Sequence, residues 1–138
     1  MKFWIDTEFN EYLGDLISMA LVSEDGHEWY EALPCANPGS WVAEHVMPII
    51  NKQPLANRED FSLSLQGFLA DFDSVHIVSD WPEDISYFCN ALITGPGQRI
   101  ATPPLTMEVR RDLPDTAKLS AIPHNALEDA RALARYSL

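Results

Sequence analysis

A near-continuous apolar run occupies residues 16–23, with the sequence LISMALVS. A strand that is apolar at almost every position is typical of the middle of a sheet covered on both faces. Residues 2–6 (KFWID) predict a neighbouring strand before it. After it, Glu24-Asp25-Gly26 predicts a tight turn into a returning strand over residues 27–33. The chain is therefore expected to open with an antiparallel meander.

Helices and strands are expected to alternate after the meander. Ser40 is the predicted N-cap of a helix that stops at Pro48, and Asn57 is the predicted N-cap of a longer helix. The other expected elements are a strand over residues 75–79, a helix opened by Pro82, a short fifth strand over residues 98–101 and a terminal helix over residues 125–136. For the proline-rich residues 103–123 we make no prediction of a helix or strand. This order predicts one α/β domain over residues 1–138, with a mixed five-stranded sheet and helices packed on it.

The composition is that of a globular protein with 46% hydrophobic residues. Two cysteines are too few for a disulfide scaffold or a thiolate metal site. The N-terminal MKFWIDTEFN turns acidic at Asp6, so it lacks the apolar stretch of a secretory signal. No apolar run approaches the ~20 residues of a membrane span. A cytoplasmic protein without a membrane segment is expected.

The charge is strongly negative, because 9 Lys and Arg face 21 Asp and Glu and give a formal net charge of −12. Tight binding of nucleic acid through its phosphates needs a basic surface, so this composition argues against a protein that binds in that way. It leaves open an enzyme that holds cations and touches only a short stretch of strand.

Asp6 and Glu8 lie two residues apart on the first expected strand. Side chains alternate along a strand, so both carboxylates are expected on one face and Thr7 on the other. Two adjacent carboxylates repel each other unless a cation lies between them, and carboxylate oxygens are the ligands that Mg²⁺ and Mn²⁺ prefer. The alternative is a solvated, acidic strand end.

Two further acidic stretches come later in the chain. Asp80 and Asp84 follow the strand over residues 75–79, where acids at a helix N-terminus also serve as caps. His124 precedes the terminal helix, and Asp129 lies just over one turn inside it, on the side of its alanines. Asp129 has an alternative role as the ion-pair partner of Arg131, Arg135 or a remote lysine.

Taken in order, these motifs resemble the DEDD 3′–5′ exonuclease superfamily, in its histidine-containing DEDDh branch. The matching motifs are Asp6-Thr7-Glu8-Phe9, a central Asp84 and His124-Asn125-Ala126-Leu127-Glu128-Asp129. Almost the whole chain, including Gly39-Ser40-Trp41-Val42, is also similar to a small bacterial 3′–5′ exoribonuclease subfamily. The resemblance implies a ribonuclease H-like fold with helices on both faces of the sheet.

The resemblance also implies a two-metal mechanism with Mg²⁺ or Mn²⁺. Asp6 would bridge both ions, Glu8 and Asp129 would complete the first site, and Asp84 would hold the second ion, with Asp80 as the alternative. His124 would act as the general base. The implied substrate is the 3′ end of single-stranded RNA, with DNA possible, and the implied product is a nucleoside 5′-monophosphate. A homodimer is a further expectation.

Phe9 and Trp81 are the candidate substrate-binding residues, because each aromatic ring lies beside a candidate metal ligand. Packing against the core is the alternative role for Phe9, and Trp81 shares this ambiguity. The acid excess also allows a different class of protein, a catalytically silent, nuclease-like module that binds a protein partner.

Overall fold

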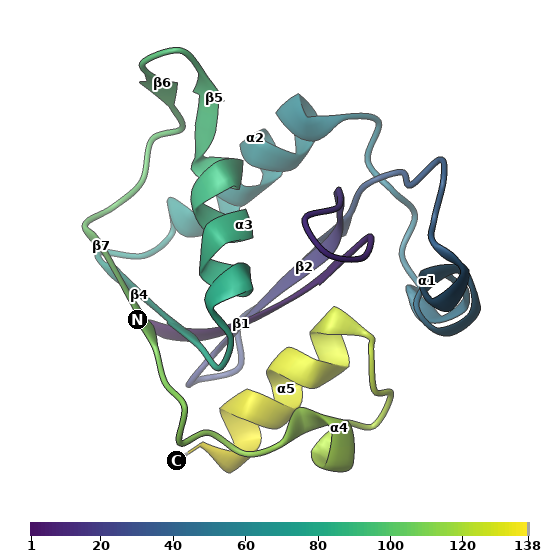
Figure 1. The fold of residues 1–138 in the computed structure, drawn as a ribbon. Helices are drawn as coiled ribbons and strands as arrows, with labels where there is room; N and C mark the ends of the chain where they lie inside the picture. The colour runs from purple at the N-terminus through teal and green to yellow at the C-terminus, as the bar shows by residue number, and fades with distance from the viewer. Residues whose placement is uncertain (138) are drawn as a thin grey trace.

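The computed structural model describes residues 1–137 (Figure 1). Its elements are β1 (Lys2–Phe9), β2 (Leu16–Ser23), β3 (Glu28–Ala32), α1 (Ser40–His45), the 3-10 turn η1 (Met47–Ile49), α2 (Arg58–Leu69), β4 (Val75–Ser79), α3 (Pro82–Leu92), β5 (Ile93–Gly95), β6 (Gln98–Arg99), β7 (Leu105–Val109), α4 (Thr116–Leu119) and α5 (Ala126–Tyr136). Within residues 1–137, no helix has the length and apolar character needed to cross a membrane.

The main sheet has five strands in the order β3-β2-β1-β4-β7. The first three strands pair antiparallel, so the predicted meander is confirmed. β4 and β7 then join β1 in parallel, with Phe3 opposite Ile77 and His76 opposite Thr106. The predicted mixed five-stranded α/β sheet is therefore confirmed, and β1 lies at its centre.

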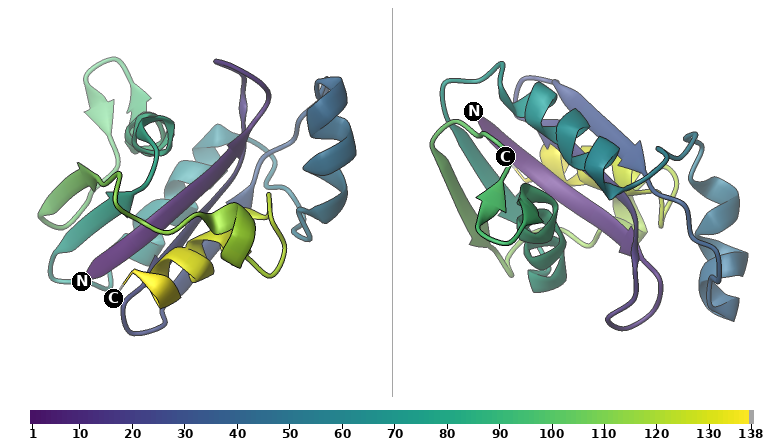
Figure 2. Two further views of the ribbon diagram at one scale, coloured as in Figure 1. Left: turned by 60° about the horizontal axis from the view of Figure 1, so that its bottom comes forward. Right: turned by 90° about the horizontal axis from the view of Figure 1, so that it is seen from above.

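Helices cover both faces of this sheet, as Figures 1 and 2 show. Alternate residues of β1 and β2 pack on one face against α2 and α3, in a core of Phe3, Ile5, Met19, Leu21, Phe61, Leu65, Leu69 and Phe88. The residues between them pack on the other face against α5, in smaller clusters of Trp4, Ala20, Val22, Val78, Ala126, Ala130 and Leu133. Burial of these apolar side chains is the main force that holds the layers together. The arrangement is a ribonuclease H-like α/β fold.

The prediction of the fifth sheet strand at residues 98–101 is wrong. Residues 98–99 form β6, which pairs with β5 in a separate hairpin around Gly95-Pro96-Gly97. The fifth strand of the main sheet is β7, within the stretch where the sequence predicts no element. β7 is a largely exposed edge strand that follows Pro103-Pro104, so it lacks the apolar alternation of an internal strand.

The two predicted helix caps have different outcomes. Asn57 caps α2 as expected, because its side chain accepts the N–H of Asp60. Ser40 is not the N-cap of α1 but its first helical residue, and Gly39 takes the cap position. The physical reason is a hydrogen bond to a residue outside the helix, since the N–H of Gly39 donates to the side-chain oxygen of Asn10 at 2.8 Å.

Candidate active site

β1 places two carboxylates on the face that α5 covers. Asp6 pairs across the sheet with Ala20, and Glu8 pairs with Ser18. Both β2 partners are small and buried, so they leave room above the strand for the carboxylates. Thr7 lies on the opposite face, as the alternation predicts, where it reaches α3.

α5 brings a third carboxylate to the same place. Ala126 and Ala130 are fully buried against the sheet, and such small side chains let the helix approach closely. Asp129, between them on the helix, is only 6% exposed. Its placement beside β1 follows from the alanine-rich face that packs this helix on the sheet.

α3 supplies a fourth carboxylate from the other side of β1. Asp84, in the first turn of α3, is 3% exposed. The hydroxyl of Thr7 donates to its Oδ1 at 2.6 Å, and the hydroxyl of Ser79 lies 3.1 Å from its Oδ2. β1 and β4 therefore hold this side chain in one orientation.

These carboxylates form two groups that share Asp6. One group joins Asp6 with Glu8 and Asp129, and the other joins Asp6 with Asp80 and Asp84. In each group, one oxygen from each residue lies within 4.8 Å of the others. No histidine of residues 1–137 adds a nitrogen to either group. The fold thus collects residues from the beginning, middle and end of the chain into one oxygen-rich site.

Asp80 differs from its expected structural role as a helix cap. The N-cap of α3 is Trp81, and no side chain caps this helix. The carboxylate of Asp80 instead joins the group of Asp6 and Asp84, because β4 runs parallel to β1 with Val78 opposite Trp4, which brings Asp80 to the level of Asp6. Both candidates for the second central carboxylate are therefore in place.

Burial and mutual repulsion act on these acids in the metal-free protein. Burial and the charges of neighbouring carboxylates hold the pKa of Asp6 well above its usual value. The same causes raise the pKa of Glu8 to about 9, and burial raises that of Asp84 to about 7. Oδ2 of Asp6 and Oδ1 of Asp129 are buried without a hydrogen-bond partner. Buried carboxylates with unpartnered oxygens are suited to a divalent cation, which removes the repulsion and supplies the missing partner.

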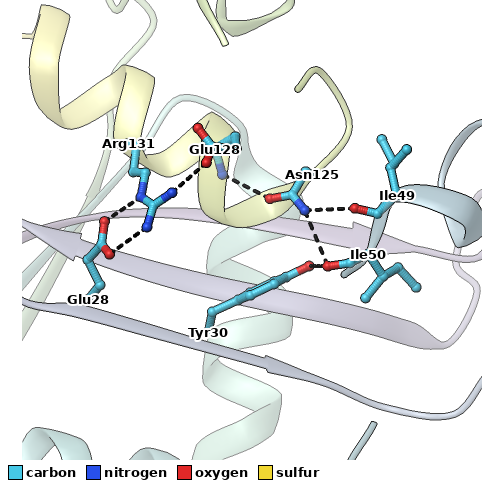
Figure 3. A network of polar contacts seen from close by, with 7 residues as sticks. All are labelled: Glu28, Tyr30, Ile49, Ile50, Asn125, Glu128 and Arg131. Carbon is cyan, nitrogen blue, oxygen red and sulfur yellow. Dashed lines mark hydrogen bonds and ion pairs between the residues drawn. The ribbon is translucent and has the colours of Figure 1, made fainter. Parts of the chain in front are cut away.

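His124 lies in the loop just before α5, with a left-handed φ of 74°. The next residue, Asn125, anchors this loop. Its side-chain oxygen accepts the N–H of Glu128 and so caps α5, and its side-chain nitrogen donates hydrogen bonds to the carbonyls of Ile49 at 2.8 Å and Ile50 at 3.3 Å (Figure 3). The backbone N–H of His124 also counteracts the rise that burial causes in the pKa of Asp129. His124 is thus fixed next to the carboxylates.

Trp41 lies against His124 from α1. The ring centroids are 5.0 Å apart in an edge-to-face arrangement, and the other neighbour of the indole is His45 at 4.8 Å. Trp41 is 51% exposed. α1 therefore forms a rim of the site beside the histidine.

Phe9 leaves the regular strand immediately after Glu8. The pairing of β1 with β2 shifts between Glu8 and Phe9, which turns the ring out of the strand alternation. Phe9 stacks on Tyr87 of α3 with a centroid distance of 4.7 Å, and the Tyr87 hydroxyl donates to the carbonyl of Gly14. A hollow of about 590 Å³ is lined in part by Tyr87 and Gly14. Phe9 is half-buried, so packing accounts for part of its surface.

Trp81 is 48% exposed and lies between the two acids of its own segment. Its Nε1 donates to Glu83 at 2.8 Å, and the guanidinium of Arg111 lies 4.9 Å from the ring centroid. One indole face is therefore already covered by a cation.

Several contacts of the site cannot be inferred from the sequence pattern. The roles of Thr7 and Ser79 in holding Asp84 join three elements, and only the opposite-face position of Thr7 hints at them. Trp41 and His124 are distant in the sequence, and no local pattern links them.

Comparison with known proteins places the chain in a family. No family model matches it. Two curated proteins named 3′–5′ exoribonuclease, from the CDC 1551 / Oshkosh and H37Rv strains of Mycobacterium tuberculosis, are each 32% identical to it over 148 aligned positions, which cover 95% of this chain and 88% of each relative. The fold and the clustered carboxylates define a ribonuclease H-like α/β protein with an acidic site that is suited to divalent metal. The chain belongs to the family of these 3′–5′ exoribonucleases, which is an exonuclease family.

Proposed function

We propose that the protein is a DEDDh-type exoribonuclease that removes nucleoside 5′-monophosphates from the 3′ end of single-stranded RNA, using two divalent cations, Mg²⁺ or Mn²⁺. The observation that carries the proposal is the pair of carboxylate groups that share Asp6. A shared carboxylate between two groups is what a site for two neighbouring cations requires. The relatives named 3′–5′ exoribonuclease support the reaction and its direction.

Each carboxylate has a defined part in holding the cations. Asp6 contributes to both sites, Glu8 and Asp129 complete the first, and Asp84 holds the second together with Asp80. When bound, the cations neutralise the scissile phosphate and promote ionisation of the attacking water. Thr7 and Ser79 orient the carboxylate of Asp84, so its position does not depend on the cation alone.

His124 acts as the general base in this proposal. A neutral imidazole is suited to accept the proton of the attacking water. The anchoring of Asn125 and the contact with Trp41 restrict where the imidazole can move. His124 is absent from both carboxylate groups, which is compatible with proton transfer rather than with metal binding.

The aromatic residues beside the carboxylates bind the terminal nucleotide. Phe9 and Tyr87 together offer an aromatic surface next to Glu8, on which a base can stack. Trp81 lies beside Asp80 and Asp84 and borders the same substrate path. Stacking does not depend on base identity, so little sequence preference is expected.

End-labelled single strands test the reaction. RNA and DNA oligonucleotides labelled at the 5′ or the 3′ end are incubated with Mn²⁺ or Mg²⁺, and product lengths are recorded with time. We expect a 5′-labelled RNA to shorten in single-nucleotide steps and a 3′-labelled RNA to release a labelled mononucleotide at once. Faster shortening of DNA would favour a deoxyribonuclease, and the absence of any cleavage would favour the silent protein-binding module. Cleavage of a circular single strand would contradict the proposal, because it has no end.

A further inference from the structure

Arg111 is a cation held against the carboxylate site. It lies two residues after β7 ends at Val109, and the N–H of Arg110 donates to the carbonyl of Ser79 at 2.7 Å. This bond keeps the chain after β7 beside the end of β4. Nη1 of Arg111 donates to the backbone carbonyl of Asp80 at 2.5 Å.

The guanidinium is fixed in orientation and still has donors to offer. Cζ of Arg111 lies over the indole of Trp81, 4.9 Å from the ring centroid. The hydrogen bond from Trp81 Nε1 to Glu83 holds that indole in place. Arginine has five N–H donors, and the hydrogen bond to Asp80 occupies one side of the group. The side chain is exposed.

Three other cations of this acidic chain are paired with carboxylates, whereas Lys2, Arg58, Arg99, Lys118 and Arg135 form no ion pair among the described residues. The ion pairs are Arg131 with Glu28 and Glu128, Arg110 with Asp112, and Lys52 with Glu31. Arg111 forms no such pair within 4.0 Å in the part of the chain that the structure describes. Its charge therefore remains available to an anion that enters the site.

We propose that Arg111 binds the phosphate that is cleaved, and that Trp81 positions its guanidinium. The proposal rests on the proposed function and names the group that recognises the phosphate beside Asp80 and Asp84. In that hydrolysis the oxygen of the attacking water forms a new bond to this phosphorus, and His124 takes a proton from the water. The bond between the phosphorus and the O3′ atom of the preceding nucleotide breaks, and the O3′ atom takes up a proton to become the new 3′-hydroxyl. The phosphate leaves as the 5′-phosphate of the released mononucleotide. A planar guanidinium matches phosphate oxygens in two parallel hydrogen bonds, which a lysine cannot form.

Product binding separates this contact from the rest of the site. Calorimetry in Mn²⁺ measures the affinity of the wild type and of Arg111→Ala for uridine 5′-monophosphate and for uridine. We expect Arg111→Ala to weaken binding of the monophosphate roughly tenfold to a hundredfold, the range of a hydrogen bond to a charged group, and to leave the affinity for uridine unchanged. Arg110→Ala is the matched control. It removes the same charge at the neighbouring position, where the side chain is already paired with Asp112.

The same measurement shows whether Trp81 positions the guanidinium. Trp81→Ala is expected to weaken binding of the monophosphate at least as much as Arg111→Ala does, and its effect on the affinity for uridine reports any direct contact of the indole with the nucleoside. Trp81→Phe keeps an aromatic face and is expected to retain most of the affinity for the monophosphate. Adding Arg111→Ala to Trp81→Ala is expected to cause little further loss, since both changes remove one interaction.

The outcomes distinguish this inference from the proposed function. If Arg110→Ala weakens binding of the monophosphate as much as Arg111→Ala does, the net charge of the protein is responsible and the inference is wrong. If the wild type shortens RNA and Arg111→Ala binds the monophosphate as the wild type does, the inference alone is wrong. If the wild type cleaves no RNA but binds the monophosphate through Arg111, the proposed function is wrong and the phosphate site stands.

Discussion

Asp6 is the residue on which both carboxylate groups depend. Its position on β1 opposite the small Ala20 lets acids from two sides approach it. Without a cation, burial and the surrounding charges favour its protonated form. The same geometry that is unfavourable without a cation would give the two proposed cations a common ligand.

Asp84 and Asp80 are predicted to contribute unequally. Asp84 is buried and held by Thr7 and Ser79, whereas Asp80 is only partly buried. Asp84→Asn is expected to abolish cleavage, and Asp80→Asn to lower its rate ~10–100-fold, the usual cost of a supporting group at a metal site. Single-turnover cleavage at saturating Mn²⁺ measures both. The reverse ranking would exchange the two assignments.

His124→Ala is predicted to slow cleavage without loss of metal binding. A positioned general base contributes ~10²–10⁴ in rate, and the carboxylates do not include this imidazole. Single-turnover rates and Mn²⁺-dependent melting are compared for His124→Ala and for the control His45→Ala, which removes the other histidine beside Trp41. Loss of stabilisation by Mn²⁺ in His124→Ala would make His124 a metal ligand.

At the scale of elements, the segment of α1 and η1 connects the two ends of the site. Asn10, directly after β1, bonds to the carbonyl of Asn37 and accepts the N–H of Gly39. Asn125, at the start of α5, bonds to Ile49 and Ile50 at the other end of the segment. The loop that carries His124 is therefore tied to the strand that carries Asp6 through this segment.

Asn125→Ala is predicted to cost more stability than an ordinary cap. The loss of a cap costs ~1 kcal/mol, and the carbonyl of Ile49 left without its partner adds a further ~1–2 kcal/mol, whereas the carbonyl of Ile50 keeps the hydroxyl of Tyr30. Asn57→Ala in α2 is the control, since the structure gives its side chain only the cap bond to Asp60. Urea unfolding compares the two variants. Equal losses would show that the tie to Ile49 and Ile50 contributes nothing.

Elements with a local sequence signal could be predicted from the sequence, whereas the edge strand β7 could not. LISMALVS is buried along its length, and Asn57 carries its own cap signal, so local pattern and final structure agree. β7 has four exposed positions out of five, and it contacts β4 through the backbone ladder and through side-chain contacts of Thr106 and Glu108 with His76. Nothing in its side chains distinguishes it from a loop.

The candidate site follows the same rule. Asp6 and Glu8 are placed together by strand alternation, which is visible in the sequence. The change of Asp80 from cap to site member, and the contacts of Trp41 and Arg111, depend on where distant segments end. Such contacts are products of the whole topology.

At the scale of the whole molecule, the stability of the metal-free protein is predicted to fall as pH rises. The pKa of Glu8 rises from 4.5 to about 9, and that of Asp84 from 3.8 to about 7, so the folded state holds protons that the unfolded state releases. The stabilisation is complete below about pH 4 and is lost progressively up to about pH 9.

Urea unfolding in EDTA measures this dependence. A loss of ~1–3 kcal/mol between pH 5 and pH 8 is expected, and Glu8→Gln should reduce it because the amide cannot ionise. The exposed acids Asp25 and Asp112 have lowered pKa values and act mainly below pH 4, outside this window. Stability that increases from pH 5 to pH 8 without metal would contradict the repulsion between the carboxylates.

The central claim is that Asp6 holds the metal on which RNA cleavage depends. One paired measurement tests it most directly: melting temperature and cleavage of a 5′-labelled RNA, both followed during a Mn²⁺ titration of the wild type and of Asp6→Asn. Because a ligand that binds only the folded state raises its melting temperature, the wild type should be stabilised and should shorten the RNA over the same range of Mn²⁺ concentration. Asp6→Asn should do neither. Cleavage by Asp6→Asn at the wild-type rate, or cleavage by the wild type in excess EDTA, would contradict the claim.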